Sequence, residues 1–66
     1  MQILVNGKPE TLPESLTVRA LLEHLGLAEQ PAAVEINKSL VPKRAHAERR
    51  LAEGDRVEVV TLVGGG

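Results

Sequence analysis

The chain has 66 residues, of which 42% are hydrophobic and none is Phe, Tyr, Trp or Cys, and its formal net charge is -1. This length fits one small domain, and the lack of aromatic side chains and of excess positive charge argues against nucleic-acid binding. The lack of cysteine excludes a disulfide, a thiolate zinc site and a persulfide carried on this chain.

The first twelve residues predict a β-hairpin. Residues 1–5 alternate as a strand does, with Leu4 on the face opposite the main apolar side chains. Asn6-Gly7 is a strong signal for a type I′ turn, because both residue types tolerate positive φ. The second strand, residues 8–12, contains Pro9, which has no N–H to donate and therefore predicts an edge strand.

The next segment predicts the main helix. After a break at residues 13–15, apolar residues recur with helical spacing on one face: Val18, Leu21, Leu22 and Leu25. Thr17 is the natural N-cap of this helix, with Ser15 as the alternative. Gly26 suits the left-handed position just past the helix end, and Leu27 is expected to fold back on the last turn.

The second half of the chain predicts three more strands. Residues 33–37 form one strand and residues 40–41 a short one, joined by a tight turn. Residues 43–50 are polar and are expected to form one or two helical turns, in part 3₁₀, before Leu51 enters the core. The last strand, residues 56–63, alternates, so that every second side chain faces away from the helix.

The resulting order is ββαββ(short helix)β. It predicts an α+β protein with the β-grasp fold of ubiquitin, in which a mixed sheet packs on one long helix. We expect the β-grasp domain to span residues 1–63 and a flexible, exposed glycine tail to span residues 64–66. The alternative, a ferredoxin-like sandwich, needs a second full-length helix, and residues 43–50 are too short and polar to form it.

The most informative feature of the sequence is the run of glycines that follows the last strand. Glycine has no Cβ, so Gly64 and Gly65 form a slender linker that can enter a narrow channel. Three extended residues reach roughly 10 Å. The pattern therefore suggests that the Gly66 carboxylate is the reactive group, presented to the active site of another protein. The alternative is an ordinary frayed end or an appended glycine run.

Other residue types indicate no catalytic machinery. His24 and His46 lie in polar surroundings without further ligands and are interpreted as solvated surface side chains. Ser15 and Ser39 lie in no nucleophile motif, and no phosphate-binding glycine loop occurs. We therefore expect no metal site and no enzymatic activity on this chain.

A basic cluster precedes the last strand: Lys43, Arg44, Arg49 and Arg50. Nearby acidic residues interrupt it, so a solvated, charge-compensated surface is the preferred interpretation, and docking of an acidic partner is the alternative.

A more specific candidate for partner binding is the outer face of the sheet. If the first and last strands are neighbours, Leu4, Val60 and Leu62 form a small aliphatic patch beside the tail. Single exposed aliphatic residues are common, but a cluster near a reactive end is a plausible docking surface.

The sequence also carries predictions about location. The start at residues 1–5 lacks the length and the basic flank of a signal peptide, and no apolar run approaches the ~20 residues of a membrane span. We therefore expect a cytoplasmic protein that does not bind membranes and is a monomer when free.

Taken together, these features resemble the thiamin-biosynthesis sulfur carriers, the ThiS family. Short sequences along the whole chain carry the resemblance: Met1-Gln2-Ile3-Leu4, Asn6, Thr17-Val18, Leu21-Leu22-Glu23, Ile36-Asn37, Val41-Pro42-Lys43, Gly54-Asp55 and Gly65-Gly66. The departures are a third glycine, Gly64, and the absence of aromatic residues.

The resemblance implies a mechanism in which this chain is a co-substrate rather than an enzyme. An E1-like adenylating enzyme would use ATP to activate the Gly66 carboxylate, so that no cofactor is bound by the chain itself. A sulfur-donor protein would then supply persulfide sulfur, leaving a thiocarboxylate on Gly66 for delivery to thiazole synthase.

Three alternatives remain open at this point. Sulfur carriers for tRNA thiolation and the small subunits of molybdopterin synthase share this fold and tail. A ubiquitin-like modifier would instead join lysines through Gly66. Least favoured is an inert β-grasp interaction module in which the glycines have no role.

Overall fold

The structure, a computed structural model, describes residues 1–62. Its elements are β1 (Gln2–Val5), β2 (Lys8–Thr11), α1 (Val18–His24), β3 (Ala32–Ile36), β4 (Ser39–Val41), the 3₁₀ helix η1 (Lys43–Ala45) and β5 (Arg56–Thr61). This is the predicted order, and it confirms the α+β, β-grasp prediction. The predicted tail at residues 64–66, and the domain boundary after residue 63, lie outside the described residues.

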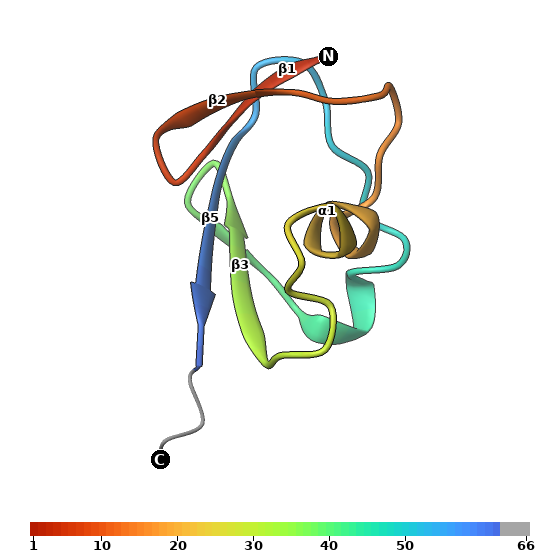
Figure 1. The fold of residues 1–66 in the computed structure, drawn as a ribbon, viewed down its shortest axis with the longest axis vertical. Coiled ribbons are helices and arrows are strands. Elements are labelled where there is room, and N and C mark those ends of the chain that lie inside the picture. The colour runs from red at the N-terminus through yellow and green to blue at the C-terminus, as the bar shows by residue number, and fades with distance from the viewer. Residues whose placement is uncertain (63–66) are drawn as a thin grey trace.

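The five strands form one mixed sheet in the order β2-β1-β5-β3-β4. β5 therefore lies in the middle, parallel to β1 and antiparallel to β3. Figure 1 shows β5 running beside β3, with α1 and η1 together on one side of the sheet. β2 is an edge strand, as the missing N–H of Pro9 predicts.

Two tight turns join the outer hairpins. Asn6 and Gly7 have φ values of 51° and 83°, which confirms the positive φ expected of a type I′ turn. Asn37 and Lys38 repeat the same geometry between β3 and β4, with φ values of 51° and 72°. Asparagine tolerates this region, whereas the left-handed backbone costs a residue such as Lys38 about 1–2 kcal/mol.

The ends of α1 follow the predicted capping chemistry. The Thr17 Oγ1 accepts a hydrogen bond from the Ala20 N–H at 3.1 Å, which satisfies a free donor of the first turn. At the other end Gly26 has φ 75°, and the Leu27 N–H donates to the Leu22 carbonyl at 2.8 Å. Neither helical element within residues 1–62 has the length and apolar character needed to cross a bilayer.

The core lies between the sheet and α1 and is entirely aliphatic. Val18 and Leu21 on α1 are fully buried, and Leu51 closes the core as predicted. The buried hydrophobic residues are Ile3, Val5, Leu12, Val18, Leu21, Leu22, Val34, Ile36, Val41, Leu51, Val57 and Val59. Because the helix covers only one side of the sheet, the outer face remains available for contacts.

Candidate functional site: the outer face of the sheet and the end of β5

The side chains of β5 alternate between the core and the outer face. Val57 and Val59 are buried, whereas Glu58 and Val60 are exposed. Val60 is 60% exposed and Leu62, just past the strand, is 58% exposed. This confirms the predicted alternation and places two large aliphatic side chains on the surface where β5 leads toward the glycines.

The register of the parallel β1–β5 pair separates the three residues of the predicted patch. The strands are neighbours, as the prediction required, but Leu4 pairs with Arg56. Val60 lies four residues farther along β5, a separation of about 13 Å at the usual rise per residue. The expectation of one patch containing Leu4, Val60 and Leu62 is therefore wrong in its geometry, because β1 runs beside the start of β5 only.

The neighbours of Val60 and Leu62 come from the beginning of β3 and the residue before it, and not from β1. Ala33 pairs with Val60, and the Leu62 N–H donates to the Pro31 carbonyl at 2.9 Å. We call Ala33, Val60 and Leu62 the apolar patch. The sequence pattern did not show this neighbour, because the antiparallel pairing of β3 with β5 joins segments that are far apart in the chain.

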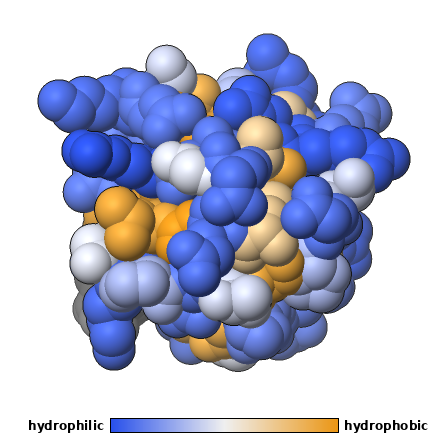
Figure 2. Space-filling model, turned by 90° about the horizontal axis from the view of Figure 1, so that it is seen from above, coloured by the Kyte–Doolittle hydropathy of each residue, from blue (hydrophilic) through white to orange (hydrophobic). Residues whose placement is uncertain are grey.

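Leu4 lines a separate hollow at the other end of the outer face. This hollow has a volume of about 410 Å³ and lies beside the two hairpin turns, at Gly7 and at Asn37 and Lys38. Figure 2 views the end of the molecule that carries β1 and β2, where apolar surface occurs in patches between hydrophilic side chains. The half-buried Leu4 thus belongs to a different part of the surface from the apolar patch.

The middle of the outer face is acidic. Glu35 and Glu58 lie directly opposite each other on β3 and β5, and both are exposed. Like charges directly opposite each other on neighbouring strands are destabilising. Among residues 1–62, neither carboxylate takes part in an ion pair. Leu40 on β4 is 65% exposed and pairs with Glu35, so β3 lies between Leu40 and Val60 of the apolar patch.

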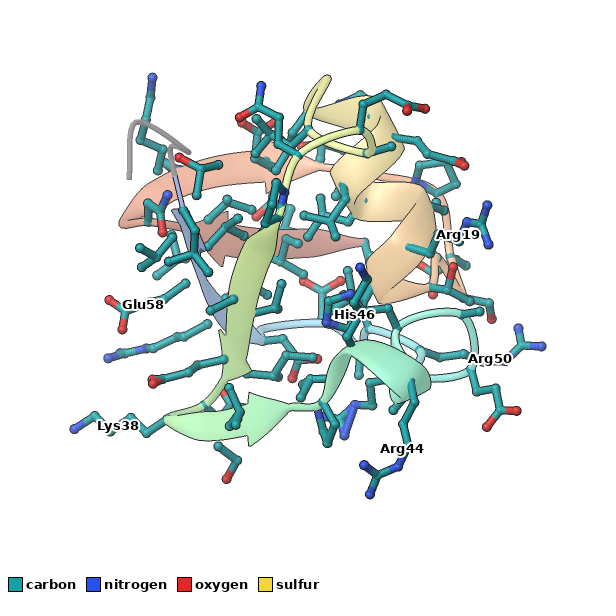
Figure 3. All side chains as sticks on the ribbon, turned by 90° about the horizontal axis from the view of Figure 1, so that it is seen from below. Arg19, Lys38, Arg44, His46, Arg50 and Glu58 are labelled. Atoms are coloured by element: carbon teal, nitrogen blue, oxygen red, sulfur yellow. The ribbon has the colours of Figure 1, made fainter. Side chains whose placement is uncertain are left out.

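Cationic side chains lie on both sides of the molecule, and Lys38 and Arg56 line the hollow of the outer face together with Glu58. Figure 3 shows Arg44 and Arg50 near η1, whereas Glu58 projects from the opposite side, away from the helix. Arg44 and Arg50 are exposed, in keeping with the solvated surface predicted for the basic cluster.

His46 is buried, which corrects the prediction of a surface side chain. It is 8% exposed, and its Nε2 lies 3.1 Å from the Val41 carbonyl oxygen. Since a carbonyl only accepts, Nε2 must carry the proton of this hydrogen bond. The reason for the burial is that the chain after η1 turns back under α1, where the Arg19 N–H donates to the His46 carbonyl at 2.9 Å. The exposed His24 agrees with its prediction.

We expect the replacement His46→Ala to lower the free energy of unfolding by about 1–3 kcal/mol, because it removes a buried hydrogen bond and leaves a void. The matched replacement His24→Ala, at an exposed position, should change it by less than about 0.5 kcal/mol. Urea unfolding of both variants provides the measurement. Equal losses in the two variants would contradict a structural role for His46.

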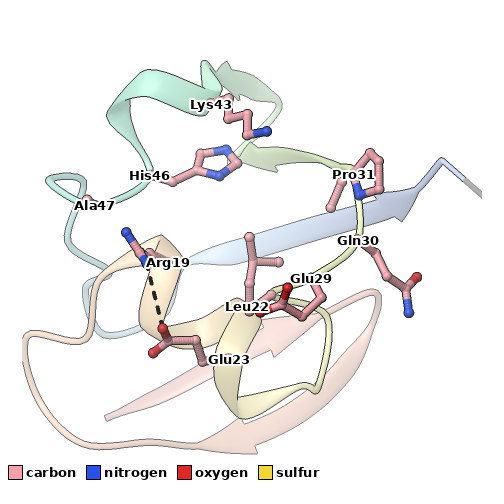
Figure 4. Close-up of a pocket in the computed structure, with 11 residues that line it drawn as sticks. Arg19, Leu22, Glu23, Glu29, Gln30, Pro31, Lys43, His46 and Ala47 are labelled. Carbon is pink, nitrogen blue, oxygen red and sulfur yellow. Dashed lines mark ion pairs between the residues drawn. The ribbon is translucent and has the colours of Figure 1, made fainter.

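A pocket of about 440 Å³ lies between α1 and η1, with His46 in its wall. Figure 4 shows side chains of both signs around it, including an ion pair between Arg19 and Glu23 at 3.7 Å. Within residues 1–62, no group of three His, Asp or Glu side chains is arranged to hold a metal ion. The mixed charges of this pocket select no single class of ligand.

The mixed sheet on one helix, with β5 in its centre leading toward the glycines, defines a small ubiquitin-like β-grasp protein. Residues 3–66 match the family model described as ThiS family. The chain belongs to this family, which confirms the resemblance inferred from the sequence.

Known proteins similar to this chain include a sulfur carrier and a longer enzyme. The sulfur carrier protein ThiS of Escherichia coli (strain K12) is 33% identical over 66 residues, the whole of both chains. A thiazole synthase of Paramagnetospirillum magneticum is 39% identical over 66 residues, and the chain spans only 20% of its length. A crystal structure of the thiamine biosynthesis protein (ThiS) from Geobacter metallireducens has a TM-score of 0.84 and 38% identity, with both chains fully covered.

Proposed function

We propose that this member of the ThiS family carries sulfur for thiazole formation on the carboxylate of Gly66. The observation that carries the proposal is the position of β5, the central strand, which leads through Leu62 toward the glycines. Because β5 pairs with a strand on each side, the position from which the following residues leave the sheet is fixed. Full-length similarity to a protein named as a sulfur carrier supports the same function.

The proposed chemistry begins with activation of a poor electrophile. A carboxylate oxygen of Gly66 attacks the α-phosphorus of ATP on an E1-like enzyme, and pyrophosphate leaves. The terminal sulfur of a donor protein's persulfide then attacks the acyl carbon, and AMP leaves. A second thiol cleaves the resulting S–S bond, so that the donor sulfur enters a disulfide and a thiocarboxylate remains on Gly66.

Thiazole synthase is the proposed acceptor of this sulfur. The similarity to a segment of a protein named thiazole synthase supports the pairing, because that polypeptide contains a region similar to this whole chain. In this proposal the chain itself is not an enzyme, binds no cofactor, and meets its partners in the cytoplasm. Gly64 and Gly65 act as the narrow linker that enters each partner.

The decisive experiment measures the intact mass of the chain after incubation with ATP, the adenylating enzyme and a persulfide donor. We expect a gain equal to the mass difference between one sulfur and one oxygen atom. A chain that lacks Gly66 is the control and should show no gain.

Other outcomes of this experiment would select the alternatives. A ladder of conjugates would indicate a ubiquitin-like modifier joined through Gly66. An unchanged mass of the folded chain would overturn the sulfur-carrier proposal and favour an interaction module. If the thiocarboxylate forms but thiazole synthase does not consume it, the acceptor belongs to tRNA thiolation or molybdopterin synthesis instead.

The apolar patch is the proposed docking surface for the adenylating enzyme. We expect Val60→Asp to raise the KM for the carrier about 10-fold, since loss of one well-packed contact of about 1.4 kcal/mol has this effect. Leu40→Asp is a matched control, because Leu40 is equally exposed and also lies beside a glutamate of the acidic pair. Pyrophosphate release at varied carrier concentration provides the measurement. Equal effects of the two replacements would contradict docking on the patch.

A further inference from the structure

The side chains of two asparagines hold β5, one on each edge of the strand. The Asn6 Oδ1 accepts a hydrogen bond from the Val59 N–H at 2.8 Å, and its Nδ2 donates to the Val59 carbonyl at 3.2 Å. On the opposite edge, the Asn37 Oδ1 accepts from the Arg56 N–H at 3.0 Å. The two asparagines have the same φ of 51°, so they place their carboxamides from equivalent turn positions.

The Asn6 side chain hydrogen-bonds β5 just past the point where the backbone pairing of β1 with β5 ends. The pairing of β1 with β5 stops at Val5 and Val57, and the Asn6 backbone N–H donates to the Val57 carbonyl at 2.8 Å. The chain then turns away at Gly7. A carboxamide offers one acceptor and a donor, as a peptide group does, so Asn6 extends the ladder by one further rung at Val59.

This additional rung lies at the functional end of the strand. Val59 immediately precedes Val60 of the apolar patch and lies seven residues before Gly66. Past Val59, the contacts that hold β5 among the described residues come from the β3 side, where Val60 pairs with Ala33, Thr61 pairs with Ala32 and the Leu62 N–H donates to the Pro31 carbonyl. Asn6 is therefore the last hydrogen-bonding group on the β1 side to fix the direction of β5.

We propose that Asn6 is a positioning residue for the reaction at Gly66. This inference rests on the proposed function. The carboxamide of Asn6 keeps the end of β5 in the conformation in which the apolar patch and the following glycines meet the adenylating enzyme together. Without it, only a fraction of the folded molecules has this conformation, and the apparent affinity falls by that fraction.

The test compares Asn6→Gly with Asn37→Gly. Glycine accepts the positive φ of both turns, so each replacement removes a carboxamide without straining its turn. Each variant loses two side-chain hydrogen bonds: Asn6→Gly loses both of those to Val59, whereas Asn37→Gly loses one to Arg56 and one to the Asp55 carboxylate. Asn37 therefore acts at the end of β5 far from Gly66. The pair therefore separates a general loss of stability from a local loss of positioning.

Three quantities are measured under conditions in which all proteins are folded: the melting temperature, the steady-state constants for adenylation, and amide hydrogen exchange at Leu62. We expect both variants to lose similar stability. Asn6→Gly should raise the KM for the carrier about 10-fold with kcat unchanged, and Asn37→Gly should change it less than about twofold. Exchange at the Leu62 amide, which donates to Pro31, should be faster in Asn6→Gly only.

Equal KM values for the two variants would overturn the proposal and leave Asn6 with a structural role only. Failure of the proposed function is recognised separately, because the parent chain would then not be adenylated at all. In that case unchanged exchange at Leu62 in Asn6→Gly would still overturn the positioning of β5 by Asn6.

Discussion

Replacing Gly65 by valine is expected to abolish adenylation of the chain while leaving its fold intact. Among the described residues the buried core consists of side chains between Ile3 and Val59, and a glycine has no side chain to contribute to a core. A β-branched side chain would instead obstruct the narrow partner channel that the glycines are proposed to enter. Misplacement of a reacting group by about 1 Å already costs on the order of 100-fold in rate, and we expect at least this loss.

The measurement is pyrophosphate release with the adenylating enzyme, together with a thermal unfolding curve for each protein. Gly65→Ala provides a graded comparison, since its single methyl group should impair the reaction less than valine does. A folded valine variant that is adenylated at the rate of the parent chain would rule out the linker role of Gly65.

The replacement Leu21→Ala should have the largest effect on stability. Leu21 is fully buried on α1, and the loss of a buried leucine side chain to alanine costs about 2–5 kcal/mol. A domain of this size has a free energy of unfolding of about 3–10 kcal/mol, so a large part of it would be removed. The melting temperature should fall by more than about 10 °C.

Leu40→Ala is the matched control for this change, because Leu40 is 65% exposed and touches no core. Its free energy of unfolding should differ from that of the parent by less than about 0.5 kcal/mol. Urea titrations compare the three proteins directly. A loss below about 1 kcal/mol for Leu21→Ala would contradict the close packing of α1 on the sheet.

The local elements could be predicted from the sequence because each depends on a few neighbouring residues. The positive φ values of Asn6 and Gly7, the N-cap at Thr17 and the left-handed Gly26 all agree with their residue types. The alternation of β5 also identified which side chains face the core. Element order then led to the β-grasp fold, since few arrangements of these elements bury all of their apolar faces.

Features that depend on packing between distant segments could not be predicted in the same way. The alternation of β1 shows which face Leu4 occupies, but not which residue of β5 lies beside it. His46 lies in a polar segment whose composition favours exposure, and only the return of the chain under α1 buries it. The roles of Gly64, Gly65 and Gly66 stay predictions, because they lie outside the described residues.

The central position of β5 has a further consequence for folding during synthesis on the ribosome. The two hairpins, β1–β2 and β3–β4, are made first, and each borders β5 rather than the other hairpin. While residues 56–61 are still inside the ribosome, the growing chain lacks the strand that joins these two hairpins into one sheet. Pairing of β1 with β5 joins residues more than 50 positions apart, and such contacts slow folding. Folding is thus delayed until the strand that leads to the glycines has emerged.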